Sequence, residues 1–318
     1  MREFPFQELA PQDKKFRDLY PKYRVWQERS ELLREADVAK LANDLLSDSA
    51  GKAVPQRVRQ QVLGQSLEGR TIRMLSMGNG ERRIFMWTQM HGDESTHTSV
   101  VLAVLNTLVE LGNQAFDGAN FLGDCSLHVI PMLNPDGAER QTRENAQGID
   151  VNRDAVELNT REGRILHDTV LKLKPHFGFN LHNQRADKTV TGTGKIAVLS
   201  VLAPPLDYDD SDSPSVIRAR QLAIEMFAVG ERLLPGHSTR YEAGYMPTAF
   251  GEWVQAQGAS TMLLEAGGWP EGQENGRDEL HYVTLMNALR SIHQQAFAEI
   301  DSTRYAKLPL NKIVPSKK

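Results

Sequence analysis

The sequence predicts a single α/β domain with a mixed, mostly parallel central β-sheet flanked by helices. Short apolar segments alternate along the chain with segments of helical periodicity, as expected where strands and helices alternate around such a sheet. The length of 318 residues suits one large domain of this class, and a hydrophobic fraction of 40% is enough for a sizeable core.

The elements follow from periodicity and turn signals. A helix is predicted over Ser30–Leu46, where apolar residues recur at helical spacing. A β-hairpin is predicted from Thr71–Met77 and Arg83–Met90 with a turn at Asn79-Gly80, because Asn-Gly is the strongest short hairpin signal. Further helices are predicted over Ser99–Leu111, Val216–Leu234 and Leu280–Ile300, and strands over Leu127–Leu133, His176–Leu181, Ile196–Leu202 and Thr261–Leu264.

The chain is expected to divide into three parts around one domain. Residues 1–60 are predicted to be an N-terminal helical extension packed on the main domain, which spans residues 61–307. Residues 308–318, with two prolines and three lysines, are predicted to form an extended tail. The proline- and aspartate-rich segment Ala203–Ser215 is expected to be a loop rather than a linker, since candidate site residues lie on both sides of it.

Composition excludes several classes of function. The net charge of −4 and pI of about 6.2 give no reason to expect a nucleic acid or an anionic membrane as partner. A single cysteine, Cys125, excludes an intramolecular disulfide framework and a multi-cysteine zinc site. No apolar run approaches a membrane span, and the first 30 residues lack an apolar signal core. A cytoplasmic location is expected, or a periplasmic or secreted one if a leader peptide has been removed.

Ionisable residues follow several of the predicted strands, at the sheet edge where α/β proteins bind ligands. His91 and Glu94 stand three residues apart after one strand, and His182 and Glu265 follow two others. Two imidazoles and one carboxylate, from His91, Glu94 and His182, would form a His₂Glu set. Three protein ligands leave one position for water, which is the arrangement of a catalytic zinc site.

The order of motifs resembles the zinc carboxypeptidase family (peptidase family M14). The matching elements are His91-x-x-Glu94, Asn134-Pro135-Asp136-Gly137, Arg143-x-Asn145-x-x-Gly148-x-Asp150-x-Asn152-Arg153, His182 and the late Glu265. The resemblance covers about residues 67–290. It implies one Zn²⁺ per chain held by His91, Glu94 and His182, with residues 61–307 as the catalytic domain. It also implies that Glu265 is the general base that activates water and returns the proton to the leaving amine.

Further roles come from the same resemblance. Arg143 matches the arginine that stabilises the oxyanion, for which a fixed guanidinium is suited. Asn152 and Arg153 match the pair that holds the terminal carboxylate of the substrate, since the planar fork of arginine can meet a carboxylate with two hydrogen bonds. Asp150 matches the carboxylate that accepts a hydrogen bond from the first zinc histidine and orients it.

The chain departs from the family pattern at two places. An aromatic residue commonly follows the Asn-Arg pair, but here Asp154-Ala155 follows. The family's loop tyrosine, which covers the substrate carboxylate, should precede Glu265 by some 20 residues. Tyr245 fits this spacing better than Tyr241, and both remain candidates.

The predicted function is therefore hydrolysis of an amide bond next to a free C-terminal carboxylate by a zinc metallopeptidase. A zinc-dependent N-acyl amino acid deacylase is the alternative, because an acyl amino acid also has a carboxylate. An alternative from another class is a non-catalytic peptide-binding domain on the same fold, against which Glu265 argues. The preferred side chain stays open: Phe250 in the pocket would suggest apolar residues, and Glu252 pointing inward would suggest basic ones. Peptidoglycan stem peptides are also possible substrates, and the oligomeric state is not determined.

Overall fold

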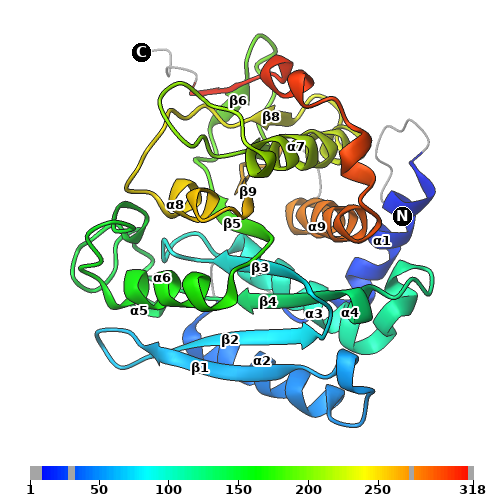
Figure 1. Ribbon diagram of the computed structural model, residues 1–318, viewed down its shortest axis with the longest axis vertical. Coiled ribbons are helices and arrows are strands. Elements are labelled where there is room, and N and C mark those ends of the chain that lie inside the picture. The colour runs from blue at the N-terminus through cyan, green and yellow to red at the C-terminus, as the bar shows by residue number, and fades with distance from the viewer. Residues whose placement is uncertain (1–8, 28–32, 272–275, 314–318) are drawn as a thin grey trace.

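The computed structural model describes residues 9–27, 33–271 and 276–313 (Figure 1). Its main sheet contains the strands β1 (Arg59–Gln65), β2 (Thr71–Gly78), β3 (Arg82–Thr88), β4 (Cys125–Ile130), β5 (Phe177–Asn183), β7 (Leu199–Leu202), β8 (Ser238–Arg240) and β9 (Ser260–Ala266). Within the described residues these eight strands lie in the order β1-β2-β4-β3-β5-β9-β7-β8. Two further strands, β6 (Lys188–Val190) and β10 (Asn311–Ile313), pair with each other in a separate small sheet.

The centre of the main sheet is parallel, and this feature positions the site. Strands β4, β3, β5 and β9 are parallel neighbours. β1 and β2 run antiparallel to the strands beside them, and β7 is antiparallel to β9 and parallel to β8. The carboxyl ends of the four parallel strands therefore meet at one edge of the sheet. The predicted fold class, a single domain with a mixed central sheet between helices, is confirmed.

Helices cover both faces of the sheet, and a separate apolar cluster fills each side (Figure 1). On one face lie α1 (Pro11–Tyr23), α2 (Glu35–Ser49), α3 (Thr96–Leu111), α7 (Pro214–Leu233) and α9 (Arg277–Gln294). On the other face, α6 (Arg161–Leu173) packs near β1, and α8 (Phe250–Ala256) packs on β5 and β9. Shorter elements are α4 (Phe121–Asp124), α5 (Pro135–Arg140) and the 3₁₀ turns η2 (Val54–Gln56), η3 (Gly112–Phe116), η4 (Val151–Arg153), η5 (Ala296–Glu299) and η6 (Ser302–Lys307).

The helix α3 is apolar enough to be compared with a membrane span. By length and composition alone, Thr96–Phe116 is long and apolar enough to cross a membrane, which differs from the expectation that no apolar run approaches a membrane span. However, 72% of its apolar window is buried inside the structure. A core helix of a globular domain has these properties. The helix lies among α1, α2 and α9, so its apolar surface is covered by protein.

The first described helix is held against the domain by a buried charge. Asp13 on α1 is fully buried and accepts hydrogen bonds from Arg232 Nε, at 2.6 Å, and from Asn287 Nδ2, at 3.0 Å. These partners belong to α7 and α9, so one carboxylate connects three helices. A buried carboxylate is tolerated only where such partners satisfy it, which explains why α1 docks in one orientation.

The predicted hairpin is wrong in its pairing, although both of its strands exist. β4 lies between β2 and β3. The backbone N–H groups of Asn79 and Gly80 donate to Leu122 and Cys125 rather than closing a two-residue turn. A Cβ on Gly80 would lie 1.9 Å from the carbonyl carbon of Asp124, so this glycine permits the close approach of the chain that precedes β4. The hairpin that does form joins β1 and β2.

Most other elements lie where the sequence predicts them, with shifted ends. The helix predicted from Ser30 begins at Glu35 in the structure, and residues 30–32 lie outside the described part. The predicted helix to Ile300 ends at Gln294 and continues as η5. The tail contributes the strand β10 at residues 311–313, while residues 314–318 lie outside the described part. The helices α1, α6 and α8 and the edge strand β1 were not predicted individually.

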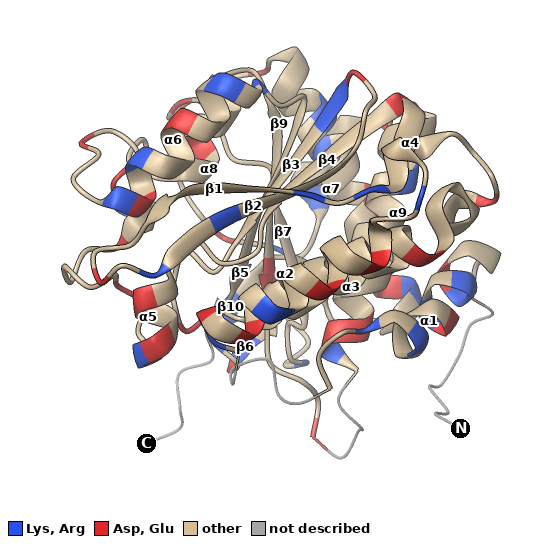
Figure 2. Cartoon of the chain, turned by 90° about the horizontal axis from the view of Figure 1, so that it is seen from below, with Lys and Arg blue, Asp and Glu red and all other residues tan. Residues whose placement is uncertain are grey.

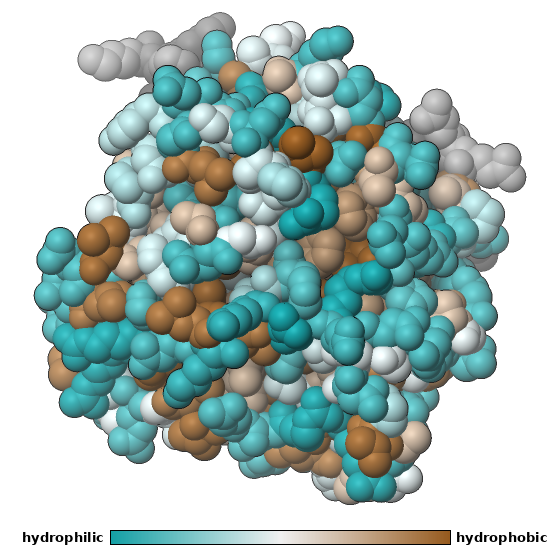
Figure 3. All heavy atoms as spheres, viewed as in Figure 1, coloured by the Kyte–Doolittle hydropathy of each residue, from teal (hydrophilic) through white to brown (hydrophobic). Residues whose placement is uncertain are grey.

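The charges are distributed without a dominant sign. Figure 2 shows lysine and arginine interspersed with aspartate and glutamate over the outer helices and loops. The face in Figure 3 is mainly hydrophilic, with apolar side chains in small separate groups. Neither view shows an extended basic face, in keeping with the net charge of −4.

Candidate active site

A tight loop after β3 carries the first two site residues. Gln89 adopts a φ of 51°, which turns the chain directly after the strand. A Cβ on Gly92 would lie 1.9 Å from the carbonyl carbon of Gly137, so only glycine allows the loop to contact the Asn-Pro-Asp-Gly segment. Asn134 of that segment donates to the carbonyl of Met90 at 3.2 Å. The Asn-Pro-Asp-Gly motif thus supports the loop that presents His91, and it does not line the cavity.

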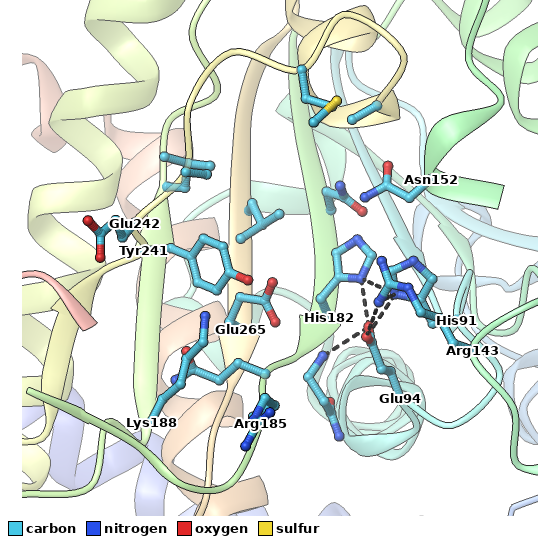
Figure 4. A pocket seen from close by; sticks show the side chains of 18 of the residues that line it. His91, Glu94, Arg143, Asn152, His182, Arg185, Lys188, Tyr241, Glu242 and Glu265 are labelled. Atoms are coloured by element: carbon cyan, nitrogen blue, oxygen red, sulfur yellow. Dashed lines mark hydrogen bonds and ion pairs between the residues drawn. The ribbon is translucent and has the colours of Figure 1, made fainter. Parts of the chain in front are cut away.

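His91, Glu94 and His182 converge at the carboxyl ends of β3 and β5 (Figure 4). The Nδ1 atoms of the two histidines are 3.2 Å apart. Glu94 lies with Oε1 2.7 Å from Nδ1 of His91 and Oε2 2.6 Å from Nδ1 of His182. All three residues are buried, and their donor atoms lie within 4.8 Å of one another. This donor set and spacing fit a catalytic zinc ion.

The electrostatics of the three residues agree with a site for a cation. Although burial acts to lower the pKa of His91, the carboxylates of Glu94 and Asp150 outweigh it and raise that pKa to about 9. Burial lowers the pKa of His182 despite the same carboxylate. The two imidazoles hold the pKa of Glu94 far below its ordinary value, against its burial. Glu94 therefore remains ionised and binds positive charge in the interior.

Asp150 and Arg143 form the outer layer of this cluster. Asp150 lies with Oδ1 3.1 Å from Nε2 of His91, the ring nitrogen that faces away from Glu94. Arg143 donates to Oδ2 of Asp150 from Nη2 at 2.9 Å and from Nε at 3.1 Å, and its Nη1 lies 3.1 Å from Nδ1 of His91. Asn145 and Gly148 shape the intervening turn: Asn145 accepts from two backbone N–H groups, and Gly148 has a φ of 72°. This turn brings Arg143 and Asp150 together.

Replacing Asp150 by asparagine is expected to weaken zinc affinity or turnover about 10- to 100-fold, the usual effect of removing a carboxylate that orients a zinc histidine. The amide keeps the size of the side chain, but it removes the negative charge beside His91 and Arg143. Zinc titration with a competing chelator measures the change. Unaltered zinc affinity and unaltered turnover together would contradict a supporting role for Asp150.

Glu265 lies at the end of β9, in register with His182 on β5. It is 6% exposed, and among the described residues its Oε2 has no hydrogen-bond partner. Burial, followed by the negative charge of Glu94, raises the pKa of Glu265 well above its ordinary value, and the ammonium of Lys188 opposes this. A carboxyl group with a raised pKa beside a cation site is suited to transferring protons.

Tyr241, and not Tyr245, is the tyrosine that the structure places in the cavity. Figure 4 shows its ring beside Glu265, and the ammonium of Lys188 lies 3.9 Å from the ring centroid. Tyr245, the residue preferred from its spacing, does not line the cavity and packs against Tyr208 with ring centroids 5.0 Å apart. Spacing from Glu265 could not decide between them, because the loop before α8 has no regular structure.

Asn152 and Arg153 lie on η4 and line the same cavity. The side-chain oxygen of Asn152 accepts from the backbone N–H of Phe250 at 2.9 Å, which ties η4 to the start of α8. Arg153 is exposed, and its Nη1 donates to the carbonyl of Asn152 at 2.7 Å. Asp154, found where an aromatic residue is common, is buried and accepts from the backbone N–H groups of Asn159 and Thr160. It therefore shapes the following loop.

The cavity that joins these residues has a volume of about 780 Å³. Glu252 lines it, whereas Phe250 is fully buried in the apolar cluster under α8. Sequence analysis did not identify Asn180 and Lys188, which also line the cavity. Asn180 could have been found, because it stands two residues before His182 on a strand and so shares its face. Lys188 lies beyond the strand and carries no comparable signal.

A model of the zinc carboxypeptidase family matches residues 46–183, a segment that contains the two histidines and Glu94. Over this segment the chain is similar to the zinc carboxypeptidase family. An uncharacterised protein of Zymomonas mobilis is 32% identical over 117 residues, 36% of this chain and 29% of that protein. The human carboxypeptidase N catalytic chain is 28% identical over 126 residues, 33% of this chain and 28% of its own length. The chain thus aligns with less than a third of each of these two relatives.

Solved structures share the fold of this chain. A metallo-carboxypeptidase from Burkholderia cenocepacia superimposes with a TM-score of 0.62 at 18% identity, covering 83% of this chain and 69% of that chain. A metallo-carboxypeptidase from Pseudomonas aeruginosa, in complex with (2-guanidinoethylmercapto)succinic acid, has a TM-score of 0.62 at 16% identity, covering 82% and 68%.

Proposed function

We propose that this protein is a zinc carboxypeptidase, a hydrolase that removes the C-terminal residue of a peptide. The observation that carries the proposal is the convergence, in one cavity, of the His91–Glu94–His182 cluster with a buried carboxyl group and a guanidinium fork. The family match supports the zinc chemistry, and the sheet topology brings the residues to one edge. Zinc, when bound by these three residues, polarises the scissile carbonyl group and lowers the pKa of its water.

The residues of the chain then have separate tasks. Glu265, close to the cluster and shielded from solvent, accepts the proton of the attacking water and returns it to the leaving amine. Arg143, held by Asp150, donates to the oxygen on which negative charge develops. Arg153 and the side-chain nitrogen of Asn152 bind the terminal carboxylate and thereby align the last peptide bond.

The test is a comparison of one blocked dipeptide with its C-terminal amide, using the zinc-loaded protein. The amide is expected to be cleaved roughly 10- to 150-fold less efficiently, the effect of losing a hydrogen bond to a charged group. Equal kcat/KM for the two would contradict an exopeptidase. Cleavage of N-acyl amino acids in preference to peptides would favour a deacylase, and no hydrolysis of either class would favour a binding domain.

A further inference from the structure

Two buried polar side chains line the cavity without a role in the hydrolysis described above. Asn180 on β5 is 1% exposed, and Glu252 on α8 is 8% exposed. Both line the cavity. A Cβ on Gly251, the residue before Glu252, would lie 3.4 Å from Nδ2 of Asn180. The amide of Asn180 therefore lies against the start of α8, close to the residue that carries the carboxyl group.

The hydrogen-bonding capacity of Asn180 is unused. Within the described part of the chain, neither its side-chain nitrogen nor its side-chain oxygen has a hydrogen-bond partner. Buried polar side chains in native proteins almost always have partners. An asparagine that faces a cavity with both atoms unpaired indicates a polar ligand at that place.

Glu252 has no positively charged side chain paired with it among the described residues. No lysine, arginine or histidine of the described residues forms an ion pair with it. Burial raises the pKa of Glu252 to about 7, and backbone hydrogen bonds and the charge of Arg153 only partly oppose this. In the proposed function Arg153 binds the terminal carboxylate of the substrate, which neutralises the one positive charge that acts on Glu252. A buried carboxylate in this position would be stabilised by a positively charged ligand group.

The surrounding walls suit a cationic group on an apolar stem. Leu202, Leu263, Met246 and Ala249 line the same cavity. Methylene stems of arginine and lysine are accommodated by such surfaces while their charged ends reach polar groups. Building on the proposed function, we propose that the cavity selects peptides with a C-terminal arginine or lysine. Glu252 is the ion-pair partner of that side chain, and the oxygen of Asn180 accepts a further hydrogen bond.

The test uses substrates that differ in charge but hardly in shape. The zinc-loaded wild-type protein is assayed with blocked dipeptides that end in arginine or citrulline, and in lysine or norleucine. We expect kcat/KM to be at least about 30-fold higher for the charged member of each pair, as for a buried, hydrogen-bonded charge pair. Glu252→Gln should reduce both ratios to within a few-fold. Glu242→Gln, which changes an exposed carboxylate at the same cavity, should preserve them.

The outcomes separate this inference from the proposed function. Equal kcat/KM for arginine and citrulline peptides, or a ratio that survives Glu252→Gln, overturns the inference while carboxypeptidase activity stands. If no peptide is hydrolysed, the proposed function fails, and calorimetry with free L-arginine and L-citrulline decides the inference. Tighter binding of arginine that Glu252→Gln abolishes supports it, and equal binding overturns it. If Glu252→Gln lowers the melting temperature severely, the two kcat/KM ratios are measured on Glu252→Asp, which keeps the charge. Both ratios should then still favour the charged peptide, and ratios of one overturn the inference.

Discussion

Replacing Glu265 by glutamine is expected to remove nearly all turnover while leaving the zinc and the fold in place. Glutamine is close in size to glutamate, so the end of β9 keeps its packing beside His182. It cannot accept a proton from the attacking water, and general acid–base catalysis typically contributes about 10²–10⁴-fold. The experiment measures kcat, zinc content and melting temperature on the wild type and the variant together.

A matched control separates catalysis from packing. Glu225 on α7 is a partly buried carboxyl group outside the cavity that contacts Ser291, and burial raises its pKa as it does that of Glu265. Glu225→Gln should leave kcat close to wild type. If Glu265→Gln retained more than about a tenth of the wild-type kcat, a general base at this position would be ruled out. Loss of zinc together with a lower melting temperature would indicate a structural role instead.

Replacing His182 by alanine is expected to abolish stoichiometric zinc binding and, with it, hydrolysis. The change removes one of three donors and leaves only His91 and Glu94, which come from one loop and cannot enclose an ion by themselves. In the structure the His182 ring also lies 2.6 Å from Glu94, so the variant leaves this buried carboxylate with one imidazole fewer. Metal analysis after dialysis measures zinc per chain, which should fall from about one towards zero.

The control for this variant is a histidine that lies elsewhere. His167 on α6 packs against Trp253 with ring centroids 4.5 Å apart and is not part of the cluster. His167→Ala should retain one zinc per chain. Full zinc occupancy in His182→Ala would show that the metal, if bound, is held by other residues, and the His₂Glu assignment would be wrong.

Local patterns in the sequence were sufficient to predict the strands and the residues that follow them. His91, Glu94, His182 and Glu265 each stand directly after an apolar segment or in the short loop behind it. Ligand sites in α/β proteins gather at the carboxyl ends of parallel strands, so the order of these segments predicted one site. The structure places all four residues at one edge of the sheet, as that principle requires.

Pairing and loop conformation could not be obtained in the same way. The Asn79-Gly80 signal describes a local turn, but β4 from more than 40 residues later inserts between β2 and β3. Likewise, two tyrosines four residues apart precede α8, and the path of an irregular loop decides which one faces Glu265. In both cases long-range packing, rather than a local preference, decides the arrangement.

The amino-acid sequence by itself determined the fold class, the candidate metal ligands and the candidate base, because each depends on residue type and order along the chain. Only the tertiary structure decided that Tyr241 rather than Tyr245 lies in the cavity, that Phe250 is buried in the core, and that Glu252 lines the same cavity as Asn180. These relations join segments 70 or more residues apart, or depend on the path of an irregular loop or the rotation of a short helix. Their physical basis is the competition between burying apolar surface and satisfying polar groups, which is resolved only when the whole chain packs.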